Sequence, residues 1–196
     1  MNAFNDIVDA LKQGEFVIVY DEHREKESDF FLLAEHVTPE KINFLMTYGK
    51  GMICIGCDES LLDQKGLGLL SDSSTCPHGT NYCMSFDAKD GITTGISASD
   101  RAKAIACLVD ASQGSETITT PGHSFPLLAK DPKERFGHTD SGVALAKKAG
   151  AVPAMVICEI LNESGEIASL TEVEELCDRF NVPMTTLESL RNEFVG

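Results

Sequence analysis

The sequence predicts a single α+β domain in which a mixed β-sheet is flanked by helices, and three observations support this fold class. The chain has 196 residues, the usual size of one domain, so we expect one domain over residues 1–196. Apolar residues make up 42% and charged residues 24%, which is an ordinary globular composition. Apolar, β-branched runs are interleaved with segments of helical periodicity, but without the strict alternation of a doubly wound fold.

In the N-terminal half, helices and strands are predicted to follow one another closely. Thr38 is expected to cap a helix that begins at Pro39, with an apolar face formed by Ile42, Leu45 and Met46. The other helices expected from apolar spacing are residues 2–13 and 99–109. The strands expected from β-branched and alternating runs are residues 16–20, 30–34, 51–55 and 82–86, with a loop at 67–79.

In the C-terminal half, the expected helices are recognised by their caps. Thr139 is expected to cap a helix that Gly150 ends, and Thr171–Glu174 to form a capping box for a helix that reaches Phe180. The remaining expected elements are a loop at 111–122 and strands at 125–129, 154–161 and 184–187, followed by a terminal helix.

The charge of the chain restricts its partners. Sixteen basic against 31 acidic residues give a net charge of −15, and no basic cluster is present, so we expect neither nucleic acid nor an anionic membrane surface as a partner. The polar N-terminus does not resemble a signal peptide, and no apolar run is long enough to span a membrane. We therefore expect a cytoplasmic protein.

The seven cysteines are odd in number and irregularly spaced, which in such a chain favours reduced thiols. Cys54 and Cys57 have C-x-x-C spacing, but they lie in an apolar run that predicts a buried strand. We interpret them as core or near-site thiols in preference to a zinc site or a redox pair.

A charged run at residues 21–29 joins two predicted strands without the Asn, Gly or Pro of a normal hairpin turn. A solvated loop is the simplest explanation of the run by itself. The alternative is a binding loop, in which Glu25, Glu27 and Asp29 supply the oxygen ligands that Mg²⁺ prefers and Arg24 binds an oxyanion.

Three further segments carry candidate functional residues. Pro121-Gly122-His123 places an imidazole at a strand end, and Glu159 ends an apolar strand where an ionised carboxylate is costly to bury. The segment 135–139, Arg-Phe-Gly-His-Thr, places an arginine and a histidine at a helix start, which favours an anion. Each segment alone also has a structural explanation: a satisfied histidine, a paired carboxylate or a helix cap.

Together these segments resemble the 3,4-dihydroxy-2-butanone 4-phosphate synthase family of riboflavin biosynthesis, over about residues 2–190. The family motifs R-E-x-E-x-D, P-G-H, R-x-G-H-T and C-E correspond to residues 24–29, 121–123, 135–139 and 158–159, and T-G-I-S-x-x-D-R corresponds to residues 94–101. The resemblance implies a lyase that converts D-ribulose 5-phosphate to L-3,4-dihydroxy-2-butanone 4-phosphate and formate. The implied route is a metal-stabilised enediol, dehydration, skeletal rearrangement and loss of C4.

The resemblance also implies a cofactor, an assembly and roles for individual residues. It implies two Mg²⁺ or Mn²⁺ ions per site and a homodimer. The family also occurs fused to GTP cyclohydrolase II, and we expect no such module here, because the sequence ends at Gly196. The implied metal ligands are Glu25 and His138, and the implied catalytic residues are His123, Glu159, Asp29 and Glu27. The implied substrate-binding residues are Arg24, Glu25, Asp29, Arg135, Phe136, Gly137, His138, Thr139 and Glu159.

The chain departs from the family pattern at several positions. Lys26, Ser28 and Asp140 stand where Asn, Gly and Glu are usual. These changes support one alternative, a non-enzymatic homologue that binds a sugar phosphate or another protein. A second alternative also stays open, a sugar-phosphate isomerase or aldolase that stops at the enediol.

Overall fold

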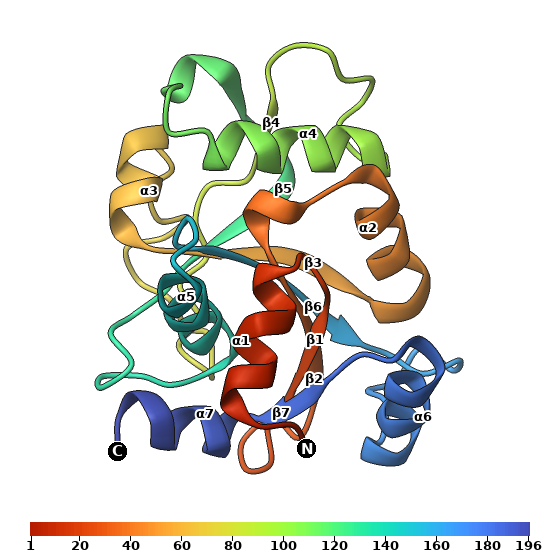
Figure 1. Cartoon of the computed structure of the whole chain (residues 1–196). Helices are drawn as coiled ribbons and strands as arrows, with labels where there is room; N and C mark the ends of the chain where they lie inside the picture. The colour runs from red at the N-terminus through yellow and green to blue at the C-terminus, as the bar shows by residue number, and fades with distance from the viewer.

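A seven-stranded mixed sheet forms the centre of the computed structural model, which describes residues 1–196 (Figure 1). The strand order is β4-β5-β3-β6-β2-β1-β7. The pairs β3/β5 and β1/β7 are parallel and the other neighbours are antiparallel, which confirms the mixed sheet. The strands are β1 (Val17–Tyr20), β2 (Ser28–Leu33), β3 (Lys50–Cys57), β4 (Phe86–Ala88), β5 (Ile118–Leu128), β6 (Ala154–Ile160) and β7 (Met184–Thr186).

Helices cover both faces of this sheet, as the sequence predicts. One face carries α1 (Phe4–Lys12), α5 (His138–Ala149) and α7 (Leu187–Phe194), which contact one another. The other face carries α2 (Pro39–Phe44), α3 (Glu59–Lys65), α4 (Ala98–Val109) and α6 (Leu170–Phe180). None of the helices has the length and apolar composition needed to cross a lipid bilayer.

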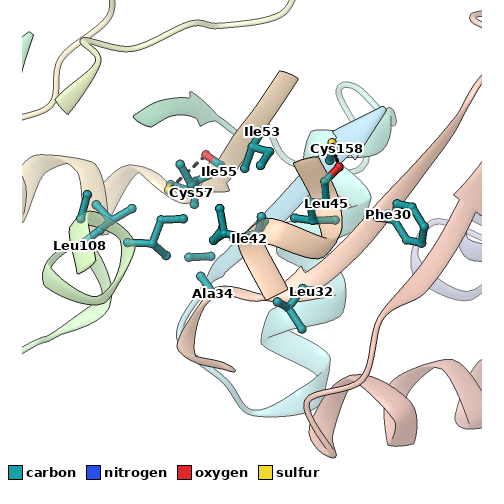
Figure 2. Packing of buried hydrophobic residues seen from close by; sticks show 14 of the residues in the cluster. Phe30, Leu32, Ala34, Ile42, Leu45, Ile53, Ile55, Cys57, Leu108 and Cys158 are labelled. Carbon is teal, nitrogen blue, oxygen red and sulfur yellow. Dashed lines mark hydrogen bonds between the residues drawn. The ribbon is translucent and has the colours of Figure 1, made fainter. Parts of the chain in front are cut away.

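Strand β2 shows how the sequence fills both layers. Successive side chains of a strand point to opposite faces, so Phe30 and Leu32 join the cluster beneath α2 and α4, whereas Phe31 and Leu33 join the cluster beneath α1 and α5. Figure 2 shows the first of these clusters, in which Ile42 lies among side chains from neighbouring elements. Burial on both faces explains why this strand is continuously apolar after Asp29.

The predicted helix at Thr38 is confirmed, but its predicted apolar face is wrong at one residue. The Thr38 hydroxyl accepts the Lys41 backbone N–H at 3.3 Å, and Ile42 and Leu45 are buried. Met46, however, is 43% exposed. The chain widens into a π-helical turn, η2 (Leu45–Gly49), and this turn interrupts the 3.6-residue period on which the prediction depends.

Two strand boundaries also differ from the prediction. The segment 111–122 is only partly a loop, because β5 begins at Ile118, where Ile118 and Thr119 pair with β4. The predicted strand at 82–86 is reduced to single bridges at Tyr82 and Cys83, and the regular strand β4 starts at Phe86. The alternation of apolar and polar residues at 82–86 therefore accompanies isolated β-bridges and not a continuous strand.

Two predicted helix caps are displaced by a few residues. Helix α5 begins at His138 with Gly137 as its N-cap, and the Asp140 carboxylate accepts the Gly137 N–H at 3.0 Å in place of a Thr139 cap. Helix α6 has its capping box at Ser169 and Glu172: the Ser169 hydroxyl accepts the Glu172 backbone N–H at 3.4 Å, and the Glu172 carboxylate accepts the Ser169 backbone N–H at 2.7 Å.

Candidate functional site

A cavity of about 390 Å³ opens where β2 begins, β6 ends and α5 begins. The predicted site residues that line it are Arg24, Glu25, Glu27, Asp29, Arg135, His138, Thr139 and Glu159. A larger cavity of about 630 Å³ lies between α1 and α6, but it contains no histidine and no residue of the motifs described above. The fold thus gathers three of the four candidate segments into one place.

Asp29 and Glu159 face each other across two central strands. They are direct partners in the antiparallel pair β2/β6, and alternation places Asp29 on the same face as Phe31. Asp29 is 3% exposed, and its Oδ1 atom has no hydrogen-bond partner. Glu159 is anchored through Oε2, which accepts the Met52 backbone N–H at 2.8 Å. Two like charges opposite each other are destabilising, which is typical of a site built for a ligand.

Asp21 orders the charged loop that precedes β2. Its buried carboxylate accepts three backbone N–H groups at 2.9–3.1 Å, those of His23, Arg24 and Glu25. Its own N–H donates to the Glu27 carbonyl at 2.9 Å. These hydrogen bonds close the turn, and Glu25 lines the cavity, which favours the binding-loop alternative for this segment. His23 and Arg24 are nevertheless exposed to solvent. Lys26 adopts φ 54° and is exposed.

Glu25, Glu27 and His138 form a cluster that suits a divalent cation. One ligand atom of each lies within 4.8 Å of the others. The Glu25 Oε2 atom is 3.4 Å from His138 Nδ1, and His138 Nε2 is 3.2 Å from the Val19 carbonyl oxygen. When Nε2 donates to that carbonyl, Nδ1 is left to act as a ligand, which is the usual arrangement of a metal-binding histidine.

The charges of this cluster shift its pKa values in opposite directions. Burial raises the pKa of Glu27 to about 8, aided by the negative charges of Asp29 and Glu25. Burial likewise raises the pKa of Asp29 to about 7, although His138 opposes it. Burial lowers the pKa of His138, but the surrounding carboxylates outweigh it and raise the value to about 9. The hydrogen bond from His138 holds the pKa of Glu25 below its ordinary value. Near neutral pH the cavity therefore contains both proton donors and proton acceptors.

The start of α5, next to this cluster, suits an anion. Helix α5 has 12 residues, and its first residues, at the positive end of its dipole, line the cavity. Arg135 approaches the Asp140 carboxylate with Nε at 3.3 Å and donates from Nη1 to the Gly79 carbonyl at 2.8 Å. Arg135 and Thr139 line the cavity, whereas Phe136 and Gly137 do not. Phe136 packs instead against Phe194 of α7.

Among the predicted catalytic residues, His123 is the one that lies apart from this cavity. It is on β5, its side chain is 43% exposed, and its Nδ1 is 2.7 Å from Asp87 Oδ2. Within one chain, therefore, the structure does not bring His123 together with Glu25 and Asp29, and its predicted role remains a prediction.

Sequence reasoning missed the residues that the segment 67–85 brings to the cavity. His78, Thr80 and Tyr82 line it, and His78 Nδ1 is 3.3 Å from Glu25 Oε1. The signal was a histidine between proline and glycine, Pro77-His78-Gly79, in a segment interpreted only as a loop. Cys54 also lines the cavity, and all seven cysteines are free thiols.

Fold and site together define an α+β protein with an enzyme-like cavity, in which a carboxylate–imidazole cluster suited to a hard cation lies beside a helix N-terminus suited to an anion. Sequence comparison gives the same result in more specific terms. The chain belongs to the 3,4-dihydroxy-2-butanone 4-phosphate synthase family, whose sequence model matches residues 5–193.

Several relatives extend this assignment. The chain is 42% identical, over 97% of its length, to the riboflavin biosynthesis protein RibBA of Cytophaga hutchinsonii, and it covers 48% of that protein. It is 39% identical, over 94% of its length, to the 3,4-dihydroxy-2-butanone 4-phosphate synthase of Neisseria meningitidis serogroup B, and it covers 52% of that protein. The chain thus spans about half the length of these curated relatives.

Solved structures confirm the fold class. RibBX, a two-domain 3,4-dihydroxy-2-butanone 4-phosphate synthase from A. baumannii, superposes with a TM-score of 0.92 at 36% identity, over 96% of this chain and 56% of that one. A 3,4-dihydroxy-2-butanone 4-phosphate synthase in complex with two magnesium ions superposes with a TM-score of 0.88 at 33% identity, over 97% of this chain and 95% of that one.

Proposed function

We propose that residues 1–196 form one catalytic domain that converts D-ribulose 5-phosphate to L-3,4-dihydroxy-2-butanone 4-phosphate and formate. The observation that carries the proposal is the meeting of Glu25, Asp29, His138 and Glu159 in one cavity, in a chain of this family. Redox chemistry is not needed, because the reaction is redox-neutral, and what it does need is acid–base groups around the substrate.

The residues present fit the divalent cations that the family implies, Mg²⁺ or Mn²⁺ and two ions per site. Glu25 and His138 would hold the metal, with Glu27 within reach, and the unpaired buried oxygen of Asp29 is a further hard donor. A related structure with two magnesium ions supports this assignment. When bound, the cation supplies Lewis-acid stabilisation of the charge that develops on the sugar oxygens.

The acid–base work is assigned to the carboxylates. Forming an enediol from a ketose requires a group that takes a proton from carbon and a group that returns one to oxygen. Glu27 and Asp29, with pKa values raised to about 8 and about 7, are suited to hold and move these protons near neutral pH. Glu159 lies beside Asp29 on the paired strand and is held in place by β3, so both carboxylates can reach a substrate in the cavity.

We assign the phosphate to the start of α5. Thr139 and Arg135 line the cavity there, and the helix N-terminus favours an anion. Gly137 acts indirectly, because its N–H is already bonded to Asp140. Arg24 also lines the cavity, and we assign it to the sugar hydroxyls.

The test is the release of formate from ribulose 5-phosphate labelled with ¹³C at C4. In the presence of Mg²⁺ the purified protein is expected to give labelled formate, observed by NMR, and a chelator is expected to stop the reaction. Substrate isomerised or cleaved without a one-carbon product would identify an isomerase or aldolase. Metal-dependent binding of the sugar phosphate without turnover would identify a binding protein.

A homodimer accounts best for the position of His123. A predicted catalytic histidine outside the cavity of its own chain can meet the substrate if a second copy presents it. We therefore expect variants that lack different halves of the site to complement each other. Glu25→Ala and His123→Ala, each inactive alone, should recover about a quarter of wild-type activity after they are unfolded and refolded together, since half of the dimers would be mixed and one of their two sites intact.

The control for this experiment is a mixture of Glu25→Ala with His138→Ala, two residues of the same cavity, which should recover nothing. Complementation by the control pair as well, or by neither pair, would show that His123 does not act across a subunit boundary.

A further inference from the structure

One carboxylate holds His123 at two points. Asp87 Oδ1 accepts the backbone N–H of His123 at 2.9 Å, and Asp87 Oδ2 is 2.7 Å from its ring Nδ1. Because a carboxylate accepts hydrogen bonds, the ring nitrogen that faces it carries the proton. The ring and the backbone of His123 are thus fixed by the same group, which leaves Nε2 as the free nitrogen.

The strand is interrupted at the point where this pair forms. Phe86 is paired with Ser124 and Asp87 with Thr119, so residues 120–123 bulge out of the β4/β5 ladder. Bulges of this kind redirect a side chain and are frequent beside active sites. Gly122 makes the bulge possible, because a Cβ there would overlap the backbone of Phe86 and Asp87.

A second segment covers the pair on the side of Asp87. Gly95, with φ 97°, lies so close that a Cβ would overlap both Asp87 Oδ2 and His123 Nδ1. Asp100 holds this segment by accepting the backbone N–H groups of Thr93 and Gly95, each at 3.0 Å. As a result the Asp87 side chain is only 8% exposed, while that of His123 is 43% exposed.

We propose that Asp87 is the positioning residue of His123: it fixes the neutral imidazole as the Nδ1–H tautomer and presents Nε2 as the proton-accepting atom toward the substrate. The inference rests on the proposed function, in which His123 acts on the substrate. A histidine whose ring nitrogens have no fixed hydrogen-bond partner populates both neutral tautomers, and its ring can rotate. A carboxylate that accepts a hydrogen bond from one ring nitrogen keeps the proton there, so the other nitrogen is the one that can act as a base.

The first test measures the tautomer in the wild-type protein. In ¹⁵N-labelled protein the neutral His123 ring, assigned with His123→Gln, should give NMR shifts of an Nδ1–H, Nε2-acceptor tautomer. An Nε2–H tautomer in the wild type would overturn the proposal. The NMR measurement of the tautomer does not depend on turnover. If the wild type released no formate, that result would overturn the proposed function but not the assignment of the tautomer.

The second test is Asp87→Asn, which is nearly isosteric but presents only one acceptor oxygen. If that oxygen keeps the backbone bond, the amide NH₂ faces Nδ1 and forces the Nε2–H tautomer. We expect kcat to fall by about 10²- to 10⁴-fold with KM changed by less than about threefold. Asp87→Glu should keep the Nδ1–H tautomer and retain at least about tenfold more kcat than Asp87→Asn.

The matched control is Asp58→Asn, which alters another hydrogen-bonded aspartate, the cap of α3, and should leave kcat unchanged. Wild-type kcat in Asp87→Asn, or an equal loss in the Asn and Glu variants, would mean that Asp87 has a structural role only and would overturn the proposal.

Discussion

Glu25→Ala is expected to release formate from ribulose 5-phosphate at no more than about a thousandth of the wild-type rate, because loss of this proposed metal ligand would remove several kcal/mol of transition-state stabilisation. The loss should be large for two reasons. Glu25 is the carboxylate nearest His138, at 3.4 Å, and it belongs to the three-residue cluster suited to a cation. Steady-state assays over a range of Mg²⁺ concentrations measure the effect, and raising the metal concentration should restore activity only in part.

The fold should survive this change, because Glu25 is half-buried at a cavity wall and contributes no core packing. Glu163→Ala is the matched control. It removes a carboxylate whose side chain is 98% exposed and lies outside the cavity, so its rate should equal that of the wild type. Near-normal formate release by Glu25→Ala would show that the cation site is wrongly assigned.

Asp29→Asn is expected to make the metal-free protein more stable and nearly inactive at the same time. Burial raises the pKa of Asp29 to about 7, and the residue is 3% exposed. Between about pH 4 and pH 7 the folded state therefore binds a proton that the unfolded state has released, so the free energy of unfolding falls as the pH rises. The decline is at most about 1.4 kcal/mol per pH unit. Asparagine does not ionise, so the variant lacks this decline in the free energy of unfolding.

Urea unfolding without metal at pH 5 and pH 8 tests this prediction. The variant should exceed the wild type by about 1–3 kcal/mol at pH 8, a gain reduced by the lost attraction to His138, and should match it more closely at pH 5. Formate release should fall at least about 100-fold, since a proton-transfer group is lost. Equal or lower stability at pH 8 would contradict the assignment of a strained, buried carboxylate.

Asp100→Asn provides the comparison of opposite sign. Hydrogen bonds from Thr93 lower the pKa of Asp100 to about 2, so its ionised form stabilises the fold above about pH 4 and loses this effect as the pH falls toward 2. Its replacement should destabilise the protein at pH 8, although both aspartates are buried. Comparison of Asp29→Asn with Asp100→Asn thus distinguishes an aspartate whose ionised form destabilises the fold from one whose ionised form stabilises it.

Much of the fold follows from local sequence pattern. The sequence-based predictions fail where long-range contacts determine the boundaries of a helix or strand. Strand β2 and the helix at Thr38 were predictable, because periodicity and a cap residue mark them. The early start of β5 was not, since Ile118 and Thr119 are extended only because β4 is available for pairing. The start of α5 was misplaced because the cap is provided from within the helix by Asp140.

The candidate site divides in the same way. Glu25, Asp29, His138 and Glu159 come from three segments that the sequence singles out, and they meet in one cavity. His78 could not be assigned, because its role depends on where the segment 67–85 passes over the cavity. No local pattern shows that His123 lies elsewhere, since its position is set by the bulge in β5 and by Asp87.

The register between Asp29 and Glu159 restricts how the length of the chain can vary during evolution. Each carboxylate lies on a paired strand, so inserting or deleting one residue within β2 or β6 would turn every later side chain to the opposite face and move a carboxylate into the apolar layer. Length changes near the cavity are tolerable only where no ladder is present, as at residues 71–79. Among homologues, gaps should therefore accumulate in that segment and be absent from the strands that carry the two carboxylates.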